Sequence, residues 1–233
     1  MTPRTAPNLS TNAVMAVVIA YHPSMSELRR QVDRLLRQVA KIIVVDNGDS
    51  VPPDGWPDGV CLITSPSNIG IAAAQNHGIA RAEELGAHWV LLMDDDSIPE
   101  PDMVRQLLVG WQKVADAGGR PAVVGPALLE DDTGVNMDQW GPDCRAMRRD
   151  FTSRRMPFPV GWLIASGSLV SIDVLSEVGG MREDYFIDMV DIEWCLRARK
   201  AGYHCYCIPH AILRHNLGVR TRVKQTFIGK ARV

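Results

Sequence analysis

Short apolar runs alternate with segments of helical periodicity, and this alternation constrains the fold of the chain more than any other feature. The first half contains four short runs that predict strands, at residues 14–20, 41–45, 60–64 and 89–93, and the last of them reads as a buried parallel strand. A helix is predicted after Ser24, where Ser24-x-x-Glu27 forms a capping box. Further helices are predicted at 71–85 and after Pro101. Strands and helices that alternate at this spacing predict an α/β fold with a parallel, doubly wound sheet.

The second half departs from this alternation after a further predicted strand at residues 121–129. Residues 130–157 form a long, charged stretch, and loops of this length are usually functional or lack fixed structure. Two helices and a last strand are then predicted, at residues 172–178, 191–201 and 203–208. The 233 residues fit one large domain behind a polar tail at residues 1–12, which lacks the apolar core of a secretory signal.

Three consecutive aspartates, Asp94, Asp95 and Asp96, follow directly on the apolar run at 89–93. Open α/β sheets bind ligands at the carboxyl ends of their strands. Adjacent carboxylates repel one another, and their oxygens suit a hard divalent ion such as Mg²⁺ or Mn²⁺. The cluster therefore predicts a metal that holds phosphates. Polar residues also end the other strands of this half: Tyr21-His22-Pro23, Asp46-Asn47-Gly48 and Ser67-Asn68.

Several classes of protein are disfavoured by what the sequence lacks. It contains neither Gly-x-Gly-x-x-Gly nor Gly-x-x-x-x-Gly-Lys, which argues against a dinucleotide dehydrogenase and a P-loop enzyme. No apolar run reaches eighteen residues, so no membrane-spanning helix is predicted. The odd number of cysteines favours reduced thiols in the cytoplasm. Cys205-x-Cys207 near His204, His210 and His215 matches no common zinc spacing, so buried thiols are the favoured interpretation.

Two further features each have a structural and a functional interpretation. From Arg214 onward there are six basic residues and no acidic one, which indicates either a solvated tail or peripheral contact with an anionic membrane surface. Asp188, Asp191 and Glu193 open a predicted helix, where carboxylates stabilise the helix dipole. Asp191 alone is more often structural, and so is His215, although neutral imidazole beside a carboxylate site can ligate a metal.

Four segments of the chain together resemble a known family. They are Val44-Val45-Asp46-Asn47, the segment from Asn68 to Gly78, Leu91-Leu92-Met93-Asp94-Asp95-Asp96-Ser97, and the segment from Phe186 to Arg199. These motifs resemble the inverting glycosyltransferases of family two, and most closely bacterial rhamnosyltransferases that use dTDP-L-rhamnose. The resemblance implies a single GT-A (Rossmann-like) domain at 13–217, with a mostly parallel sheet flanked by helices. Its nucleotide-sugar half would be 13–98 and its acceptor half 99–217, followed by a basic tail at 218–233.

The resemblance also implies a role for each matching residue. Asp191 would be the general base of the transfer. The donor would contact Tyr21, Asp46, Asn68, Asn76, Asp94 and Asp95. The metal, Mg²⁺ or Mn²⁺, would be held by Asp94, Asp96 and His215. The acceptor pocket would include Trp162, Ser166 and Gly167.

The implied function is transfer of L-rhamnose from dTDP-L-rhamnose to a hydroxyl of a glycan or lipid-linked acceptor in cell-envelope or polysaccharide biosynthesis. The enzyme would be cytoplasmic, peripheral at the inner face of the plasma membrane through its basic tail, and without a nucleic-acid partner. Two departures from the family pattern qualify this. Val190-Asp191 stands where many relatives have Glu-Asp. Relatives also commonly continue beyond this C-terminus, so a truncated chain or a short variant is expected.

Three alternatives stay open at the level of sequence. The donor could be UDP-galactofuranose or a UDP-hexose. A sugar-nucleotide nucleotidyltransferase also uses carboxylates and a metal, but it would need a glycine-rich basic loop where residues 20–23 are Ala-Tyr-His-Pro. A domain that binds a nucleotide sugar without turnover is the non-enzymatic alternative.

Overall fold

The computed structural model describes residues 9–48, 50–130, 139–140, 146–147 and 155–215. Its centre is a nine-stranded mixed sheet in the order β3-β2-β1-β4-β10-β6-β11-β5, with β9 paired to β11. A separate antiparallel pair joins β7 (Gln139–Trp140) to β8 (Ala146–Met147). The strands of the main sheet are β1 (Val14–Ala20), β2 (Lys41–Asp46), β3 (Val60–Thr64), β4 (Trp89–Asp94), β5 (Ser97–Pro99), β6 (Pro121–Glu130), β9 (Phe158–Val160), β10 (Ser168–Ser171) and β11 (His204–His215).

The four strands β3, β2, β1 and β4 are parallel, as their alternation with helices predicts. Their register brings the carboxyl ends into line, because Asp46 lies opposite Ala20 on one side and Thr64 on the other. Asp94 lies opposite Ile19. The polar residues that follow these strands therefore meet at one edge of the sheet, where α/β folds bind ligands.

The rest of the sheet is mixed and was only partly predictable. β10 runs antiparallel to both β4 and β6, and β5 and β9 run antiparallel to β11. These three strands have only three or four residues each, too few for a clear periodic signal. The predicted end of the last strand at residue 208 is wrong: β11 continues to His215, with a register shift between Ile208 and Ile212 that accommodates Pro209.

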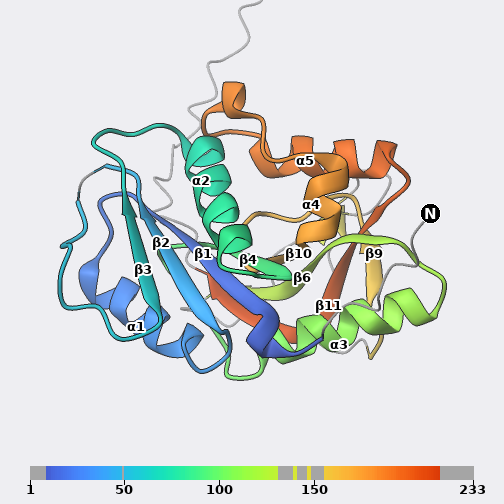
Figure 1. The fold of residues 1–233 in the computed structure, drawn as a ribbon. Coiled ribbons are helices and arrows are strands. Elements are labelled where there is room, and N and C mark those ends of the chain that lie inside the picture. Colours follow the sequence, from blue (N-terminus) through green and yellow to red (C-terminus); the bar gives the residue numbers. More distant parts are fainter. Residues whose placement is uncertain (1–8, 49, 131–138, 141–145, 148–154, 216–233) are drawn as a thin grey trace, which may run out of the picture.

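Five α-helices cover the two faces of the sheet. Figure 1 shows α2, α4 and α5 on one face and α1 and α3 on the other. In the described part of the chain no helix is long and apolar enough to cross a bilayer. Ser24 precedes α1 as predicted, but its hydroxyl pairs with that of Ser26 at 3.1 Å and makes no capping bond, so the predicted capping box is wrong. The helices are α1 (Met25–Leu35), α2 (Ile71–Glu84), α3 (Met103–Asp116), α4 (Ile172–Val178) and α5 (Val190–Lys200).

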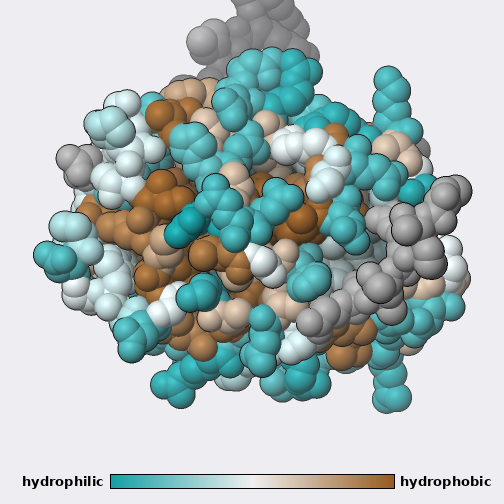
Figure 2. Space-filling model, viewed as in Figure 1, coloured by the Kyte–Doolittle hydropathy of each residue, from teal (hydrophilic) through white to brown (hydrophobic). Residues whose placement is uncertain are grey.

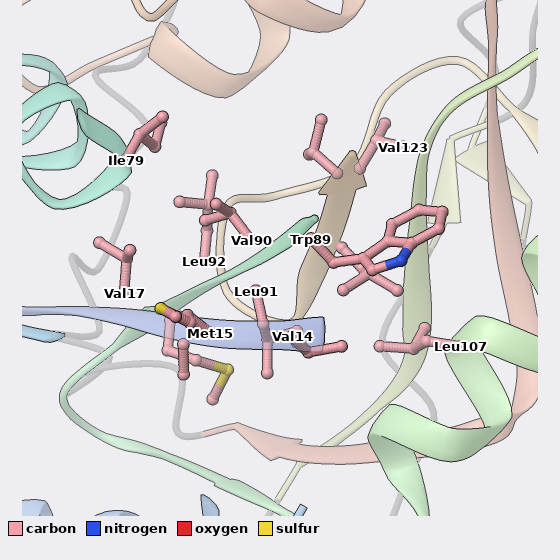
Figure 3. Close-up of a cluster of buried hydrophobic side chains, with 14 of the residues drawn as sticks. Val14, Met15, Val17, Ile79, Trp89, Val90, Leu91, Leu92, Leu107 and Val123 are labelled. Atoms are coloured by element: carbon pink, nitrogen blue, oxygen red, sulfur yellow. The ribbon is translucent and has the colours of Figure 1, made fainter. Parts of the chain in front are cut away.

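The core lies on both faces of β1 and β4. Side chains alternate along a strand, so Leu92 points toward Ile79 of α2 whereas Leu91 points to the opposite face (Figure 3). Trp89, fully buried, meets Trp111 of α3 edge to face with ring centroids 4.7 Å apart. On the outside, Figure 2 shows hydrophobic residues between hydrophilic ones over the middle of the face seen in Figure 1. The two central strands are thus held rigidly, and they carry the polar edge.

Candidate active site

A cavity of about 230 Å³ opens at the carboxyl ends of β1, β2 and β4, as the parallel topology predicts. The start of α2 and the segment before α5 close it from the other side. It is lined by Ile19, Tyr21, Asn47, Asn68, Gly70, Ile71, Asp94, Asp95, Phe186 and Ile187. The structure therefore brings together four of the six predicted donor residues, Tyr21, Asn68, Asp94 and Asp95, from three different strand ends.

Two asparagines shape one wall of this cavity. Asn47 donates from Nδ2 to Oδ1 of Asn68 at 3.0 Å, and its own Oδ1 accepts the backbone N–H of Ile69 at 2.9 Å. Asn68 also accepts the backbone N–H of Gly70 at 2.8 Å. The pair fixes the turn that leads into α2. Asn47 was not among the predicted site residues, although its place directly after a strand was a signal for it.

The remaining two predicted donor residues lie outside the cavity lining. Asp46 is fully buried, and its carboxylate accepts bonds from the backbone N–H groups of Ser50 and Val51 and from the Ser50 hydroxyl. Asn76, on α2, exchanges hydrogen bonds with the backbone of Met181 and donates to Glu183. In this structure Asp46 orders the turn after β2, and Asn76 ties α2 to the segment before α5.

Tyr21 and Asp95 form the outer part of the cavity. The backbone N–H of Tyr21 donates to Oδ2 of Asp95 at 3.0 Å. The Tyr21 side chain is 51% exposed, and its ring lies against His22 with centroids 4.4 Å apart. Burial raises the pKa of Asp95. The exposed Tyr21 ring can stack against a flat ligand group, and the Asp95 carboxylate beside it can accept a hydrogen bond from a hydroxyl.

Asp94 experiences the strongest electrostatic perturbation in the site. Burial, and then the charges of Asp96, Asp95 and Asp191, raise its pKa to about 7. The deprotonated form is thus held in an environment that disfavours negative charge, and a bound cation would relieve this. The two ends of the site, β4 and α5, meet at residues 165 and 166, because the Ala165 N–H donates to Asp191 and the Ser166 hydroxyl accepts the N–H of Asp94.

The predicted metal ligands fit a divalent ion only in part. Asp94 and Asp96 flank one tight turn, and Mg²⁺ commonly uses one or two carboxylates and completes its shell with water and substrate phosphate. Within the described ranges no group of three or more His, Cys, Asp or Glu side chains is arranged to hold a metal. His215 lies at the end of β11 opposite Ser97, and its side chain is outside the description. Cys205 and Cys207 are buried free thiols, as predicted.

Two of the predicted acceptor residues lie beneath the aspartates. The Ser166 hydroxyl, almost fully buried, donates to the Ser97 hydroxyl at 2.9 Å and accepts the backbone N–H of Asp94 at 3.3 Å. Gly167 has a φ of +83°, and a Cβ there would lie 2.6 Å from Pro126. These residues support the turn that carries Asp94. Trp162, the third, is half-buried and packs against the core.

Asp191 lies in the first turn of α5 and is positioned by the backbone. Its Oδ1 accepts the N–H of Ile192 at 2.8 Å and its Oδ2 accepts the N–H of Ala165 at 3.2 Å. Burial raises its pKa, and these backbone hydrogen bonds oppose the rise. Asp191 also borders a cavity of about 20 Å³. A fixed, partly buried carboxylate with a raised pKa has the properties of a general base.

A strained turn connects the two ends of the site. Phe186 has φ 59° and ψ −66°, and the N–H of Ile187 donates to the carbonyl of Tyr185 at 2.7 Å, which together form a γ-turn of the rare, strained kind. The Phe186 carbonyl accepts the N–H of Ile71 at 2.6 Å and so caps α2. Gly70 permits this approach, since a Cβ on it would lie 2.7 Å from the Phe186 ring.

An exposed apolar surface adjoins this turn. It consists of Tyr185, Phe186, Ile187, Met189 and Leu196, which are between 37% and 63% exposed. A second cavity of about 370 Å³ lies beside it, lined by Tyr185, Met189, Ile192, Glu193, Leu196, Arg197 and Lys200. Glu193 and Arg197 form an i,i+4 ion pair on α5, at 2.9 Å.

Comparisons with known proteins agree with this geometry. The model of the family described as glycosyl transferase family 2 matches residues 16–161. The chain is 30% identical to a dTDP-rhamnosyl transferase, RfbF, of Shigella flexneri over 88% of this chain and 69% of that protein. It is 24% identical to an N-acetylglucosaminyl-diphospho-decaprenol L-rhamnosyltransferase of Mycobacterium tuberculosis, over 87% of this chain and 75% of that protein.

The fold is also found among solved structures. A crystal structure of GalNAc-T7 with UDP, GalNAc and Mn²⁺ superposes with a TM-score of 0.68 at 13% identity. The alignment covers 87% of this chain and 43% of that one. The likeness concerns the fold alone and extends to less than half of the other protein.

Proposed function

The chain belongs to glycosyl transferase family 2, and from that premise we propose that it transfers L-rhamnose from dTDP-L-rhamnose to a hydroxyl group with inversion at the anomeric carbon. The two rhamnosyltransferases to which it is similar support the choice of sugar. The observation that carries the proposal is the meeting of two differently placed carboxylates at one sheet edge: Ala165 donates its N–H to Asp191, and the hydroxyl of the next residue, Ser166, accepts the N–H of Asp94. In this proposal Asp94 lies on the side of the leaving nucleotide, and Asp191 lies on the side of the attacking hydroxyl.

On the donor side, the proposal assigns the cavity at the ends of β1, β2 and β4 to the nucleotide. Tyr21 presents an exposed ring against which a pyrimidine can stack, and the Asp95 carboxylate accepts from a ribose or sugar hydroxyl. Asn47 and Asn68 hold the opposite wall in shape through their mutual hydrogen bond. The apolar side chains of Ile19, Ile71 and Ile187 enclose the rest of the cavity.

On the acceptor side, Asp191 acts as the general base. The acceptor hydroxyl attacks the anomeric carbon, its proton passes to the Asp191 carboxylate, and the bond to the nucleoside diphosphate breaks on the opposite side. The two backbone hydrogen bonds from Ala165 and Ile192 hold the carboxylate in one orientation. Its raised pKa makes it a stronger proton acceptor than an exposed aspartate would be.

A divalent cation is part of the proposal, with Mg²⁺ or Mn²⁺ held by Asp94 and Asp96 and completed by His215. When bound, it neutralises the negative charge that develops on the leaving diphosphate. The crowding of carboxylates around Asp94 favours such an ion. We further propose that the acceptor is a glycan or lipid-linked sugar of the cell envelope, and that the exposed apolar surface beside Phe186 faces it.

A donor panel tests this function. The purified chain is incubated with dTDP-L-rhamnose, UDP-galactofuranose or UDP-glucose, with Mn²⁺ or with EDTA, and release of nucleoside diphosphate is followed. We expect the fastest release from dTDP-L-rhamnose and a loss of release in EDTA. An equal or greater rate with another donor would contradict the assignment of the sugar, and a full rate in EDTA would contradict the role of the metal.

A further inference from the structure

Gln31 of α1 lies directly beneath the aspartate turn, in a position that the proposed function does not explain. Its side chain is fully buried. The Nε2 atom donates to the backbone carbonyl of Asp94 at 2.5 Å and to that of Ser97 at 2.6 Å. These two residues are the last of β4 and the first of β5, so one amide nitrogen joins both ends of the turn that carries Asp94, Asp95 and Asp96.

The amide oxygen of Gln31 forms no hydrogen bond to the described residues. Within the described residues its Oε1 is the buried side-chain atom that has no hydrogen-bond partner. A buried acceptor without a partner destabilises a protein. An apolar residue would continue the face of α1 formed by Leu28, Val32 and Leu35, all of which are buried. The two bonds to the turn are therefore the feature that distinguishes this residue from an ordinary core position.

A second buried glutamine shows what a purely structural residue looks like in this fold. Gln38, just beyond α1, donates from Nε2 to the carbonyls of Glu100 and Arg34 at 3.0 and 3.4 Å, and its Oε1 accepts the N–H of Val104 at 3.1 Å. Both ends of its amide are bonded, and it fastens the start of α3. These hydrogen bonds involve none of the aspartates, so Gln38 is a matched control for Gln31.

We propose that Gln31 is a positioning residue for the metal, which fixes the spacing of the Asp94 and Asp96 carboxylates by clamping both ends of their turn. The inference rests on the proposed metal-assisted transfer. Carboxylates that repel one another spread apart unless the backbone beneath them is held. Residues that orient the groups around a metal in this way typically change its affinity by about 10- to 100-fold when they are replaced. Gln31 supplies this restraint from 63 residues away in sequence.

The test compares Gln31→Met with Gln38→Met, since methionine keeps the length of the side chain and removes its amide. Binding of Mn²⁺ is measured by electron paramagnetic resonance in the presence of dTDP, and thermal unfolding is measured without metal. We expect Gln31→Met to raise the Kd for Mn²⁺ about tenfold or more. We expect Gln38→Met to leave that Kd within about twofold of wild type, although both variants lose thermal stability.

A second variant covers the case in which Gln31→Met does not fold. Gln31→Asn keeps the amide but withdraws it by one methylene, and it should weaken Mn²⁺ binding as well, while thymidine binding without metal stays unchanged. Equal Mn²⁺ affinity in wild type and in a folded Gln31 variant would overturn the inference and leave the proposed function standing. Failure of the wild-type chain to bind Mn²⁺ at all would overturn both the inference and the proposed role of the metal, while the choice of sugar would still be decided by the donor panel.

Discussion

At the scale of single residues, the site depends on the carboxylates of Asp94 and Asp191. Burial raises the pKa of both, but their neighbouring groups differ. Asp94 sits among three other carboxylates whose charges add to the effect of burial. Asp191 receives two backbone hydrogen bonds that oppose that effect. The first environment attracts a cation, and the second keeps a carboxylate available to accept a proton. Two aspartate side chains thus differ in their properties because their surroundings differ.

Replacement of Asp191 by asparagine should separate binding from transfer. The asparagine side chain retains the shape of the carboxylate and can still accept a backbone N–H through its amide oxygen, but it cannot take up the acceptor proton. We expect Asp191→Asn to bind dTDP with an unchanged Kd and to lose about 10²–10⁴-fold in transfer rate. Glu193→Gln, in the same turn of α5, is the control and should retain transfer. Normal transfer by Asp191→Asn would show that another group is the base.

Replacement of Asp94 by asparagine should stabilise the metal-free protein at neutral pH. The Asp94 carboxyl has a folded-state pKa of about 7, above its ordinary value of about 3.9. Between these values the unfolded chain releases the proton first, so wild-type stability falls as pH rises from about 4 to about 7 and then levels off. The asparagine variant does not lose stability in this way, and we expect its free energy of unfolding in EDTA at pH 7.5 to exceed that of wild type by up to about 4 kcal/mol.

Urea unfolding of both proteins between pH 4 and pH 8 measures this difference. Asp102→Asn is the control, because the bond to Arg105 lowers the pKa of Asp102 and that residue is exposed. It should not gain stability at neutral pH. With Mn²⁺ and dTDP present, the order reverses and wild type becomes the more stable protein. A constant difference between Asp94→Asn and wild type across the pH range would contradict the explanation.

Single residues were predictable where they ended a strand and less so where a tertiary contact decides their role. Asp94, Asp95 and Tyr21 lie at or just after the ends of apolar runs, and parallel pairing brings such ends together. The side chain of Asp46 has the same position in sequence, yet it turns inward to Ser50 and Val51. The orientation of the Asp46 side chain depends on the turn that follows β2, and the geometry of that turn cannot be predicted from the spacing of apolar residues. Gln31 did leave a signal, a polar residue on the apolar face of a predicted helix.

At the scale of elements, the start of α2 and the segment from 183 to 190 act as one unit. The Phe186 carbonyl caps α2, its ring lies over Gly70, and Asn76 fastens the middle of α2 to Met181. The apolar pattern within either segment does not predict these contacts, because the two segments are more than a hundred residues apart in the sequence. The helices α2, α4 and α5 were predicted to within one residue at each end, whereas only the start was predicted for α1 and α3.

Replacement of Gly70 by alanine should cost more than the same change at Gly86. Both glycines have a positive φ, +85° and +84°, and Gly70 also has a ψ of 155°, a conformation essentially restricted to glycine. A Cβ on Gly86 meets nothing within 4 Å. Gly86→Ala therefore reports backbone strain alone, about 1 kcal/mol. Gly70→Ala adds contacts of 2.7 and 2.8 Å with the Phe186 ring and carbonyl, for a further cost of roughly 1–3 kcal/mol. It should also weaken dTDP binding, because Phe186 lines the cavity.

Urea unfolding and dTDP titration of the two variants provide the comparison. If Gly70→Ala and Gly86→Ala lose the same free energy of unfolding and both bind dTDP as wild type does, the contact between Gly70 and Phe186 does not shape the cavity.

At the scale of the whole molecule, one rigid sheet carries two halves of a site. The parallel strands β1, β2 and β4 end in the cavity that we assign to the donor, and the antiparallel strand β10 returns the chain so that α5 can bring Asp191 to the same edge. The parallel half was predicted well because β1, β2 and β4 are buried apolar runs and β3, although only partly buried, is also mostly apolar. The mixed half was not, since its strands are short and pair by tertiary context.

Ligand binding should therefore stabilise the molecule as a unit. At a dTDP concentration of about 100 Kd with saturating Mn²⁺, the linkage amounts to about 2.7 kcal/mol, or a rise in Tm of about 5–10 °C for a domain of this size. EDTA should abolish most of the rise. Differential scanning fluorimetry with dTDP, with Mn²⁺ and with both measures this, and an identical Tm with and without Mn²⁺ would contradict a shared site.

The γ-turn at Phe186 has a consequence for engineering. The residues that form a wall of the proposed donor cavity are continuous with those that begin the helix of Asp191, and the Phe186 carbonyl holds α2 on the other side. We therefore expect a change that adapts this wall to a different sugar also to displace Asp191, the proposed proton acceptor. Donor exchange between relatives should therefore succeed only when residues 69–71 and 183–191 are transplanted together as one cassette.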